Sequence, residues 1–242
     1  MFKTAFIGCS WTQGHNLHYT NTYPFILHYS MDENQVINAG RSGASWFNYP
    51  QTVKYIHQKY DPDYYVIQHT TPDRGMLLWC SDKKRYSIIT RDHDVYGNYI
   101  QLWDNSQCYY HLTVGMAEKL VSGSDPEITD HMFSEIKRKS GLDKEAVVSR
   151  VKYWLDHERL HPLMFDKYEE SIEYCNLYIN SIGKKVINLF WLDNTFVVKT
   201  QNQFIVEKEI DFKKYVVDDG YHFEKEGNTE LAKLLKRRFF SG

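Results

Sequence analysis

Cysteine is scarce in this chain, and its spacing argues against the sites that cysteine usually builds. The four cysteines, Cys9, Cys80, Cys108 and Cys175, are scattered over 242 residues, and none of them forms a Cys-x-x-Cys pair. A zinc knuckle or a disulfide framework needs closely spaced or regularly paired cysteines. We therefore expect a fold stabilised by an apolar core, with no metal and no other cofactor.

Long apolar runs and a strong net charge are also missing. No stretch approaches the roughly 18 apolar residues of a membrane-spanning helix, and the N-terminus lacks the basic flank and apolar region of a secretory signal. We expect a soluble protein made in the cytoplasm, and assembly into a virus particle or release by cell lysis stays open. The formal net charge of −2 gives no reason to expect nucleic acid or a membrane surface as a partner.

What the sequence has is the composition of an ordinary globular protein. Hydrophobic residues make up 42% of the chain and charged residues 25%, and a chain of 242 residues can bury a core within one domain. We therefore treat residues 1–242 as a single domain. Tyrosine is frequent, at 19 residues, and an aromatic-rich stretch between Trp79 and Tyr110 offers rings that could stack on sugars.

Apolar runs alternate with helical patterns in the first half of the chain. Residues 5–8, 36–40 and 64–69 are short apolar runs typical of buried strands, and residues 184–192 form a further one. A helical pattern over residues 45–60 separates the second run from the third. This alternation predicts an α/β fold: a three-layer α/β/α domain with a flavodoxin-like parallel sheet of about five strands.

The middle of the chain breaks this alternation. The stretch after the third run has no clean period, and helical patterns follow it, one of which ends at Gly141. We interpret residues 75–160 as a helical and aromatic insertion that lies over the site. The last helix is expected within residues 227–240, with Asn228 or Thr229 as its N-cap.

Three short polar blocks lie at the ends of predicted strands or just before the last helix. Gly8-Cys9-Ser10 follows the first strand, the block "NAGRSGAS" (residues 38–45) ends the second, and "DDGYHFEKEGN" (residues 218–228) precedes the last helix. The carboxyl ends of parallel strands are where such sheets carry their chemistry. Each block alone is weak evidence, because Gly-x-Ser is usually a turn before a helix and Asp-x-x-His in a loop is mostly surface.

The residue types in these blocks are those of a serine hydrolase. The hydroxyl of Ser10 is a poor nucleophile until a base takes its proton. His222 is the candidate base, since an imidazole changes charge near neutral pH. Asp219, three residues earlier, can hydrogen-bond the other ring nitrogen and stabilise the imidazolium.

The order and spacing of the blocks resemble the SGNH (GDSL-like) hydrolase superfamily over nearly the whole chain. That family has a Gly-x-Ser block after its first strand, an Asn-x-x-x-Ser-Gly block after its second, and an Asp-x-x-His pair near its C-terminus. The resemblance implies that Ser10 is the nucleophile and His222 the base. The family spacing selects Asp219 over its neighbour Asp218 as the partner of His222.

The same resemblance implies an oxyanion hole. Its donors would be the backbone N–H groups of Ser10 and Gly43 and a side chain from the block after the third strand. The family usually has Gly-x-Asn there, whereas this chain has "IQHTTPDR", with Thr70 at the matching place. A threonine hydroxyl can donate one hydrogen bond. The Thr-x-Pro-x-Arg form is similar to that of a subgroup of small SGNH proteins that includes bacteriophage-encoded members.

The expected function is therefore that of a serine esterase that forms an acyl-Ser10 intermediate. Its partner would be a small-molecule or glycan ester, and O-acetyl groups on a carbohydrate are the preferred substrate class. Family range and the aromatic-rich stretch support that preference. A second hypothesis is a binding module of SGNH fold that has lost turnover; the intact Ser10, Asp219 and His222 argue against it, and Thr70 argues for it.

The remaining motifs in the sequence are weaker evidence for a function. The sequence "HERLH", from His157 to His161, matches the His-Glu-x-x-His pattern of zinc metalloproteases, which needs both histidines on one helix face. Pro162 follows directly and disfavours helical backbone at His161, so we expect a polar helix end instead. Cys9 is expected to be a small buried residue rather than a nucleophile. The first loop lacks a Gly-x-Gly-x-x-Gly or Walker pattern, which argues against a nucleotide-binding domain.

Overall fold

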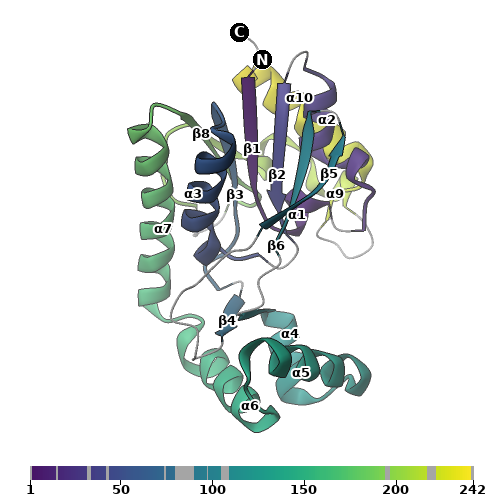
Figure 1. Ribbon diagram of the computed structural model, residues 1–242, viewed down its shortest axis with the longest axis vertical. Helices are drawn as coiled ribbons and strands as arrows, with labels where there is room; N and C mark the ends of the chain where they lie inside the picture. Colours follow the sequence, from purple (N-terminus) through teal and green to yellow (C-terminus); the bar gives the residue numbers. More distant parts are fainter. Residues whose placement is uncertain are drawn as a thin grey trace.

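The protein is a layered α/β structure in which a parallel sheet lies between helices (Figure 1). The computed structural model describes residues 2–14, 16–31, 34–41, 44–73, 75–79, 90–96, 98–104, 109–193, 197–216 and 222–240. Within these residues the main sheet has the strand order β5-β6-β2-β1-β3-β8-β9. Its strands are β1 (Phe2–Gly8), β2 (Asn34–Gly40), β3 (Tyr64–His69), β5 (Thr90–Tyr96), β6 (Tyr99–Asp104), β8 (Lys185–Phe190) and β9 (Gln203–Ile205).

The strand order confirms the predicted fold class. β2, β1, β3, β8 and β9 pair in parallel in the order expected of a flavodoxin-like sheet. The sheet is wider than the predicted five strands, because β6 adds to β2 in parallel and β5 pairs with β6 in the antiparallel sense. In β6 the consecutive residues Tyr99, Ile100, Gln101 and Leu102 are all buried. The polar Gln101 interrupts this short apolar run, so the sequence shows neither a continuous apolar stretch nor a regular alternation there.

Helices cover both faces of the sheet. α3 (Tyr49–Tyr60) and α7 (Pro162–Ser181) pack on one face, and α2 (Tyr23–Tyr29) and α10 (Lys225–Leu235) pack on the other. Along β1, Ile7 joins the first apolar layer and Phe6 the second, because successive strand residues point to opposite faces. The shorter helices are α1 (Ser10–Gln13), α8 (Val206–Glu209), α9 (Phe212–Tyr215), η1 (Tyr19–Asn21), η2 (Trp46–Asn48), η3 (Trp154–Glu158) and η4 (Lys236–Phe240).

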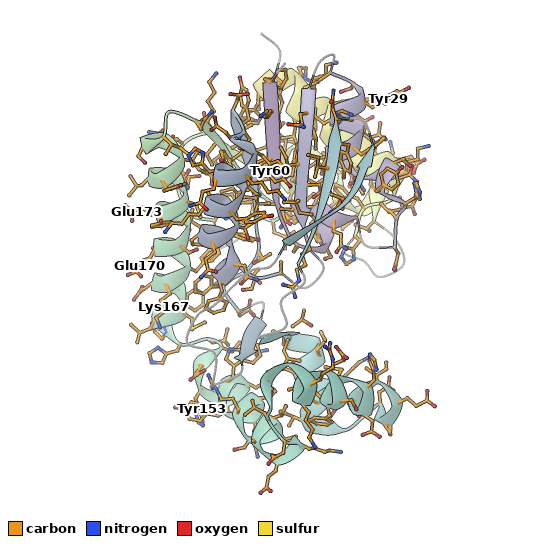
Figure 2. All side chains as sticks on the ribbon, viewed as in Figure 1. Tyr29, Tyr60, Tyr153, Lys167, Glu170 and Glu173 are labelled. Carbon is orange, nitrogen blue, oxygen red and sulfur yellow. The ribbon has the colours of Figure 1, made fainter. Side chains whose placement is uncertain are left out.

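α7 shows why these helices dock on the sheet. Tyr168, Ile172, Cys175 and Ile179 recur at helical spacing and are buried in the first apolar layer. The opposite side of the helix carries Lys167, Glu170 and Glu173, which point away from the sheet (Figure 2). The apolar stripe therefore determines how this helix is oriented on the sheet.

A helical unit lies beyond the carboxyl ends of β1, β2 and β3 (Figure 1). It contains the antiparallel pair β4 (Gly75–Trp79) and β7 (Tyr109–Thr113) and the helices α4 (Val114–Ser122), α5 (Pro126–Ser140) and α6 (Lys144–Tyr153). Ile136, Val151 and Trp154 belong to an apolar core of its own. The chain leaves the main sheet after β3, returns for β5 and β6, and leaves again at β7.

Helix ends agree with the sequence patterns in one case and differ in another. α5 ends at Ser140, and Gly141 follows with a φ of 75°, as predicted. The predicted N-cap of the last helix was wrong, because α10 begins at Lys225 and Asn228 lies in its first turn. The side chain of Asn228 is buried, donates to the carbonyl of Phe223 and accepts the N–H of Tyr23. Tertiary packing rather than capping accounts for that asparagine.

The last residue of β2 provides a test of how closely the chain packs at the carboxyl edge. A Cβ atom on Gly40 would lie 2.5 Å from the backbone nitrogen of Gln13 and 2.7 Å from the carbonyl carbon of Thr12. Because backbone atoms must move to admit it, we expect Gly40→Ala to lower the free energy of unfolding by about 1–3 kcal/mol, measured by urea denaturation.

Gly115 provides the matched control. It lies in α4, and among the described residues a Cβ atom there would meet nothing within 4 Å. Gly115→Ala should raise the free energy of unfolding by about 0.5 kcal/mol, because alanine restricts the unfolded chain and favours helix. Equal stability of the two variants would contradict the close approach at Gly40.

Candidate active site

The structure brings Ser10 and His222 together at the carboxyl edge of the sheet. Ser10 follows β1 and is the first residue of α1, and its Oγ lies 2.8 Å from Nε2 of His222, a residue 212 positions later in the chain. Ser10 is buried, with 3% of its surface exposed. In the tautomer that carries its proton on Nδ1, the Nε2 of His222 accepts the hydrogen bond from the hydroxyl. This is the geometry of a nucleophile with its base.

Two other predicted site residues cannot be placed. Asp219, and its neighbour Asp218, lie outside the described residues, as does Gly43.

Backbone contacts join the residues that flank the segment carrying His222. Phe223 pairs with Val216 in an isolated antiparallel bridge, and the N–H of Glu224 donates to the carbonyl of Tyr215 at 2.8 Å. α9 ends at Tyr215, and α10 begins directly after Glu224. These contacts join the end of α9 to the start of α10 directly beside His222. They therefore limit where the imidazole ring can lie.

A buried amide holds the turn that presents Ser10. The Oε1 atom of Gln68 accepts the N–H of Cys9 at 2.9 Å and the hydroxyl of Thr12 at 3.2 Å. A Cβ atom on Gly8 would lie 2.2 Å from the Oγ1 of Thr12 and 2.7 Å from that same Oε1. Glycine at position 8 is therefore required by the close approach of these two side chains.

A second buried amide ties the turn to the neighbouring strand. The Nδ2 atom of Asn38 donates to the carbonyl of Thr12 and to the hydroxyl of Tyr99, and its Oδ1 accepts the N–H of Gly40 at 2.8 Å. Burial raises the pKa of Tyr99 to about 12, so its phenol stays neutral at ordinary pH. Asn38 and Gln68 form the polar layer behind Ser10.

The sequence interpretation missed the role of Gln68. Its only signal was an amide inside the apolar strand run "YYVIQH". A polar side chain in such a run must find partners when the strand is buried. Here the partners are Cys9, between β1 and α1, and Thr12, on α1, and they cannot be identified from the run itself.

Thr70 lies at the same edge of the sheet with its hydroxyl buried. It follows β3 directly and is 6% exposed, and its Oγ1 is buried without a hydrogen-bond partner in the described part of the chain. A buried hydroxyl left unpaired costs about 1–3 kcal/mol. Such a cost is commonly retained where function uses the group.

His69 lies on the opposite face of β3 in a polar cluster of its own. Asn188 donates through Nδ2 to the Oδ1 of Asn176 and to the carbonyl of Gln201, so its Oδ1 is left to accept from Nε2 of His69 at 2.7 Å. Nδ1 of His69 has no hydrogen-bond partner among the described residues, and the ring stacks on Phe190. Burial lowers the pKa of His69 to about 4.

The zinc pattern at His157 to His161 is contradicted by the backbone. His157 lies in η3, whereas His161 has an extended conformation, with φ −68° and ψ 136°. Nδ1 of His161 accepts the N–H of Leu163 as the N-cap of α7. The two histidines do not share one helix, because the residue before Pro162 leaves the helical region. In the described ranges, no group of three or more His, Cys, Asp or Glu side chains is placed to hold a metal ion.

Two further predictions concern Cys9 and the membrane. Cys9 is a free cysteine with no exposed surface, as expected of a small buried residue. Among the helices that the structure describes, none is both long and apolar enough to span a bilayer.

Comparison with known proteins identifies the fold. No protein-family model and no curated protein sequence matches this chain. The solved structure of TesA matches with a TM-score of 0.51 at 10% identity, over 97% of this chain and 96% of that one. The psychrotrophic esterase EstA from Pseudoalteromonas sp., inhibited by monoethylphosphonate, matches with a TM-score of 0.49 at 9% identity, over 96% and 93%. A lipolytic G-D-S-L family protein from Veillonella parvula matches with a TM-score of 0.41 at 11% identity, over the whole of both chains.

The likeness to TesA shows the fold, and it spans nearly the whole of both chains. The chain has the layered α/β fold of TesA, which agrees with the fold class that the sequence predicts. At 10% identity the likeness establishes the fold but assigns no role to any residue of this chain.

The buried imidazole next to Thr70 predicts a pH-dependent stability. Between pH 6.5 and pH 4 the unfolded chain binds a proton at His69 that the folded protein, with a pKa of about 4, does not bind. The free energy of unfolding should therefore fall by about 3 kcal/mol across this interval through His69 alone. His69→Gln should remove that part of the slope, measured by urea denaturation at several pH values.

His131→Gln is the matched control, because His131 is exposed on α5. It should keep the pH slope of the native protein. A His69→Gln variant whose slope equals that of His131→Gln would show that His69 is not buried in its neutral form.

Proposed function

We propose that this chain is a serine esterase of the SGNH type that hydrolyses an ester through an acyl-Ser10 intermediate. The observation that carries the proposal is the 2.8 Å contact between Ser10 Oγ and His222 Nε2. The contact lies at the carboxyl ends of parallel strands, where sheets of this kind carry their chemistry. The sequence resemblance to the SGNH hydrolases and the layered α/β fold support the same conclusion.

The proposed reaction runs in two halves. His222 takes the proton of Ser10 as Oγ bonds to the ester carbonyl carbon, and it then gives that proton to the departing alcohol oxygen as the carbon–oxygen bond breaks. Water attacks the acyl-Ser10 carbonyl in the second half, with His222 again accepting and returning one proton. The products are a carboxylic acid and an alcohol, and Ser10 is regenerated.

The negative charge on the carbonyl oxygen needs hydrogen-bond donors in both halves. We assign this role to the N–H of Ser10, the N–H of Gly43 and the hydroxyl of Thr70. The Oγ1 of Thr70 is buried and has no hydrogen-bond partner among the residues that the structure describes, which supports the last assignment. The roles of Gly43, and of Asp219 as the partner of Nδ1 of His222, come from the sequence resemblance.

The proposed substrate class is an O-acetylated carbohydrate. Its support is the range of the family and the aromatic-rich stretch from Trp79 to Tyr110. Part of that stretch belongs to β4 and β7, in the unit that lies beyond the carboxyl edge. A panel of chromogenic esters of increasing chain length, run beside acetylated glycans, would identify the acyl group.

Removing the nucleophile tests the proposal most directly. Ser10→Ala should lower kcat by several orders of magnitude while the protein stays folded, because the residual rate comes from binding and oxyanion donors alone. Ser181→Ala, at the exposed end of α7, is the matched control and should keep the native rate. The measurement is the initial rate on the best ester of the panel, with circular dichroism to check folding.

Two outcomes would favour other functions. If the native protein binds glycans but hydrolyses no ester, the result would favour a binding module. The threonine at position 70 supports that hypothesis. Full activity of Ser10→Ala would contradict serine chemistry. Chelators should leave the rate of the native protein unchanged.

The proposed oxyanion donor can be tested at Thr70. Thr70→Val keeps the shape of the side chain and removes its one donor, so kcat should fall on the order of 10²-fold. Thr70→Ser keeps the hydroxyl and should retain most of the rate. If the valine and serine variants have equal kcat values, Thr70 is not a donor to the reacting oxygen.

A further inference from the structure

Two buried aromatic residues between β2 and β3 donate hydrogen bonds to the backbone on either side of Thr70. Nε1 of Trp46, in η2, donates to the backbone carbonyl of Pro72 at 3.0 Å. The hydroxyl of Tyr49, the first residue of α3, donates to the backbone carbonyl of Gln68 at 2.7 Å. Each of these carbonyls lies two residues from Thr70. The backbone is therefore held by a side chain both before and after the threonine.

Both donors are themselves fixed in the core. Trp46 and Tyr49 are 3% and 2% exposed and belong to the apolar layer under α3 and α7. The ring of Trp46 stacks on that of Phe47 at a centroid distance of 3.8 Å, and its backbone carbonyl accepts the hydroxyl of Ser171 on α7 at 3.2 Å. Movement of either donor would disturb this layer, so the two hydrogen bonds connect the chain at Thr70 to the packed side of the sheet.

We propose that Trp46 and Tyr49 are positioning residues that aim the hydroxyl of Thr70 at the reacting carbonyl oxygen. This inference rests on the proposed esterase function and on the donor role assigned there to Thr70. Neither aromatic side chain contacts the substrate in this scheme. Each acts through the backbone carbonyl that it holds on one side of the threonine.

A threonine donor depends closely on the position of its backbone. The hydroxyl is attached to Cβ, and a single torsion angle, which is stiff in a β-branched side chain, sets its direction. A shift of the backbone at Thr70 therefore moves the hydroxyl by a similar amount. An oxyanion donor must lie within about 2.7–3.1 Å of the oxygen, and a displacement of about 1 Å can lower the rate on the order of 10²-fold.

Two conservative substitutions remove these hydrogen bonds one at a time. Trp46→Phe and Tyr49→Phe each delete one donor and keep an aromatic ring in its place. Each should lower kcat by about 3- to 10-fold, which is less than the loss of the Thr70 hydroxyl itself, because the other hydrogen bond remains. KM should change by less than about 2-fold, since the hydroxyl stabilises charge that develops only after the substrate has bound.

A double-mutant cycle tests whether the effect passes through Thr70. In a Thr70→Val background the donor is already absent, so a change in its position has little left to alter. Trp46→Phe and Tyr49→Phe should then each lower kcat by less than about 2-fold. A general loss of folded protein would lower the rate equally in both backgrounds.

The chain offers a matched control for each substitution. Tyr65→Phe removes a hydroxyl from the same strand as Thr70 and the same apolar layer, and that hydroxyl has no hydrogen-bond partner among the described residues. Trp154→Phe makes the tryptophan substitution in the separate core of the helical unit, where Trp154 is 2% exposed. Both controls should keep the native kcat, with circular dichroism to check that every variant is folded.

A measurement without substrate keeps this inference separate from the esterase proposal. NMR couplings between the methyl carbon of Thr70 and its backbone nitrogen and carbonyl carbon report the rotamer of the side chain, and the amide signal of Thr70 reports its backbone. Trp46→Phe and Tyr49→Phe should change these signals. The two controls should leave them near their native values.

The outcomes are distinct. Unchanged Thr70 signals in both Trp46→Phe and Tyr49→Phe would overturn the inference whether or not the protein hydrolyses esters. An equal loss of kcat in the native and Thr70→Val backgrounds would also overturn it, as would a native kcat in Thr70→Val itself, and in both cases the esterase proposal would survive. Changed Thr70 signals in a protein that hydrolyses no ester would support the hold of the two aromatic residues on Thr70 and count against the esterase proposal.

Discussion

The site depends on the two hydrogen bonds that the side-chain amide of Gln68 accepts. This amide accepts the N–H of Cys9 and the hydroxyl of Thr12 inside the core, so the chain turns at the end of β1 instead of continuing along the sheet. Breaking these bonds would leave buried polar groups unpaired at a cost of about 1–3 kcal/mol each. The turn that presents Ser10 is therefore determined by a neighbouring strand, and Gly8 allows that strand's side chain to approach.

How much could be predicted from the sequence depends on how local each signal is. Ser10 and His222 could be predicted because each sits in a short block whose residue types carry the chemistry, and the order of the blocks agrees with the strand order. The alternation of apolar runs and helices predicted a parallel sheet with helices on both faces, and the structure confirms that arrangement. The roles of Gln68 and Asn38 could not be predicted, because most of their partners lie far away in the sequence, at Cys9, Thr12 and Tyr99. β6 was missed because the polar Gln101 interrupts its short apolar run.

The main sheet and the helical unit beyond its carboxyl edge have separate apolar cores. The turn at Ser10 and the bridge that carries His222 are built from the main sheet and its two apolar layers. The helical unit beyond the carboxyl edge has its own core around Ile136 and Trp154. Side chains on that unit can therefore change without altering the polar layer behind Ser10, which is how one scaffold can serve different substrates.

The distance in sequence between the two members of the pair has a consequence for protein synthesis. Ser10 belongs to the first strand and turn, while His222 precedes α10, the helix whose Asn228 accepts the N–H of Tyr23 on α2. A chain still being translated therefore holds Ser10 for nearly the whole of its elongation without His222 beside it. The contact between the two side chains can form only after the segment that precedes α10 has been synthesised, so this pair is among the last parts of the fold to be assembled.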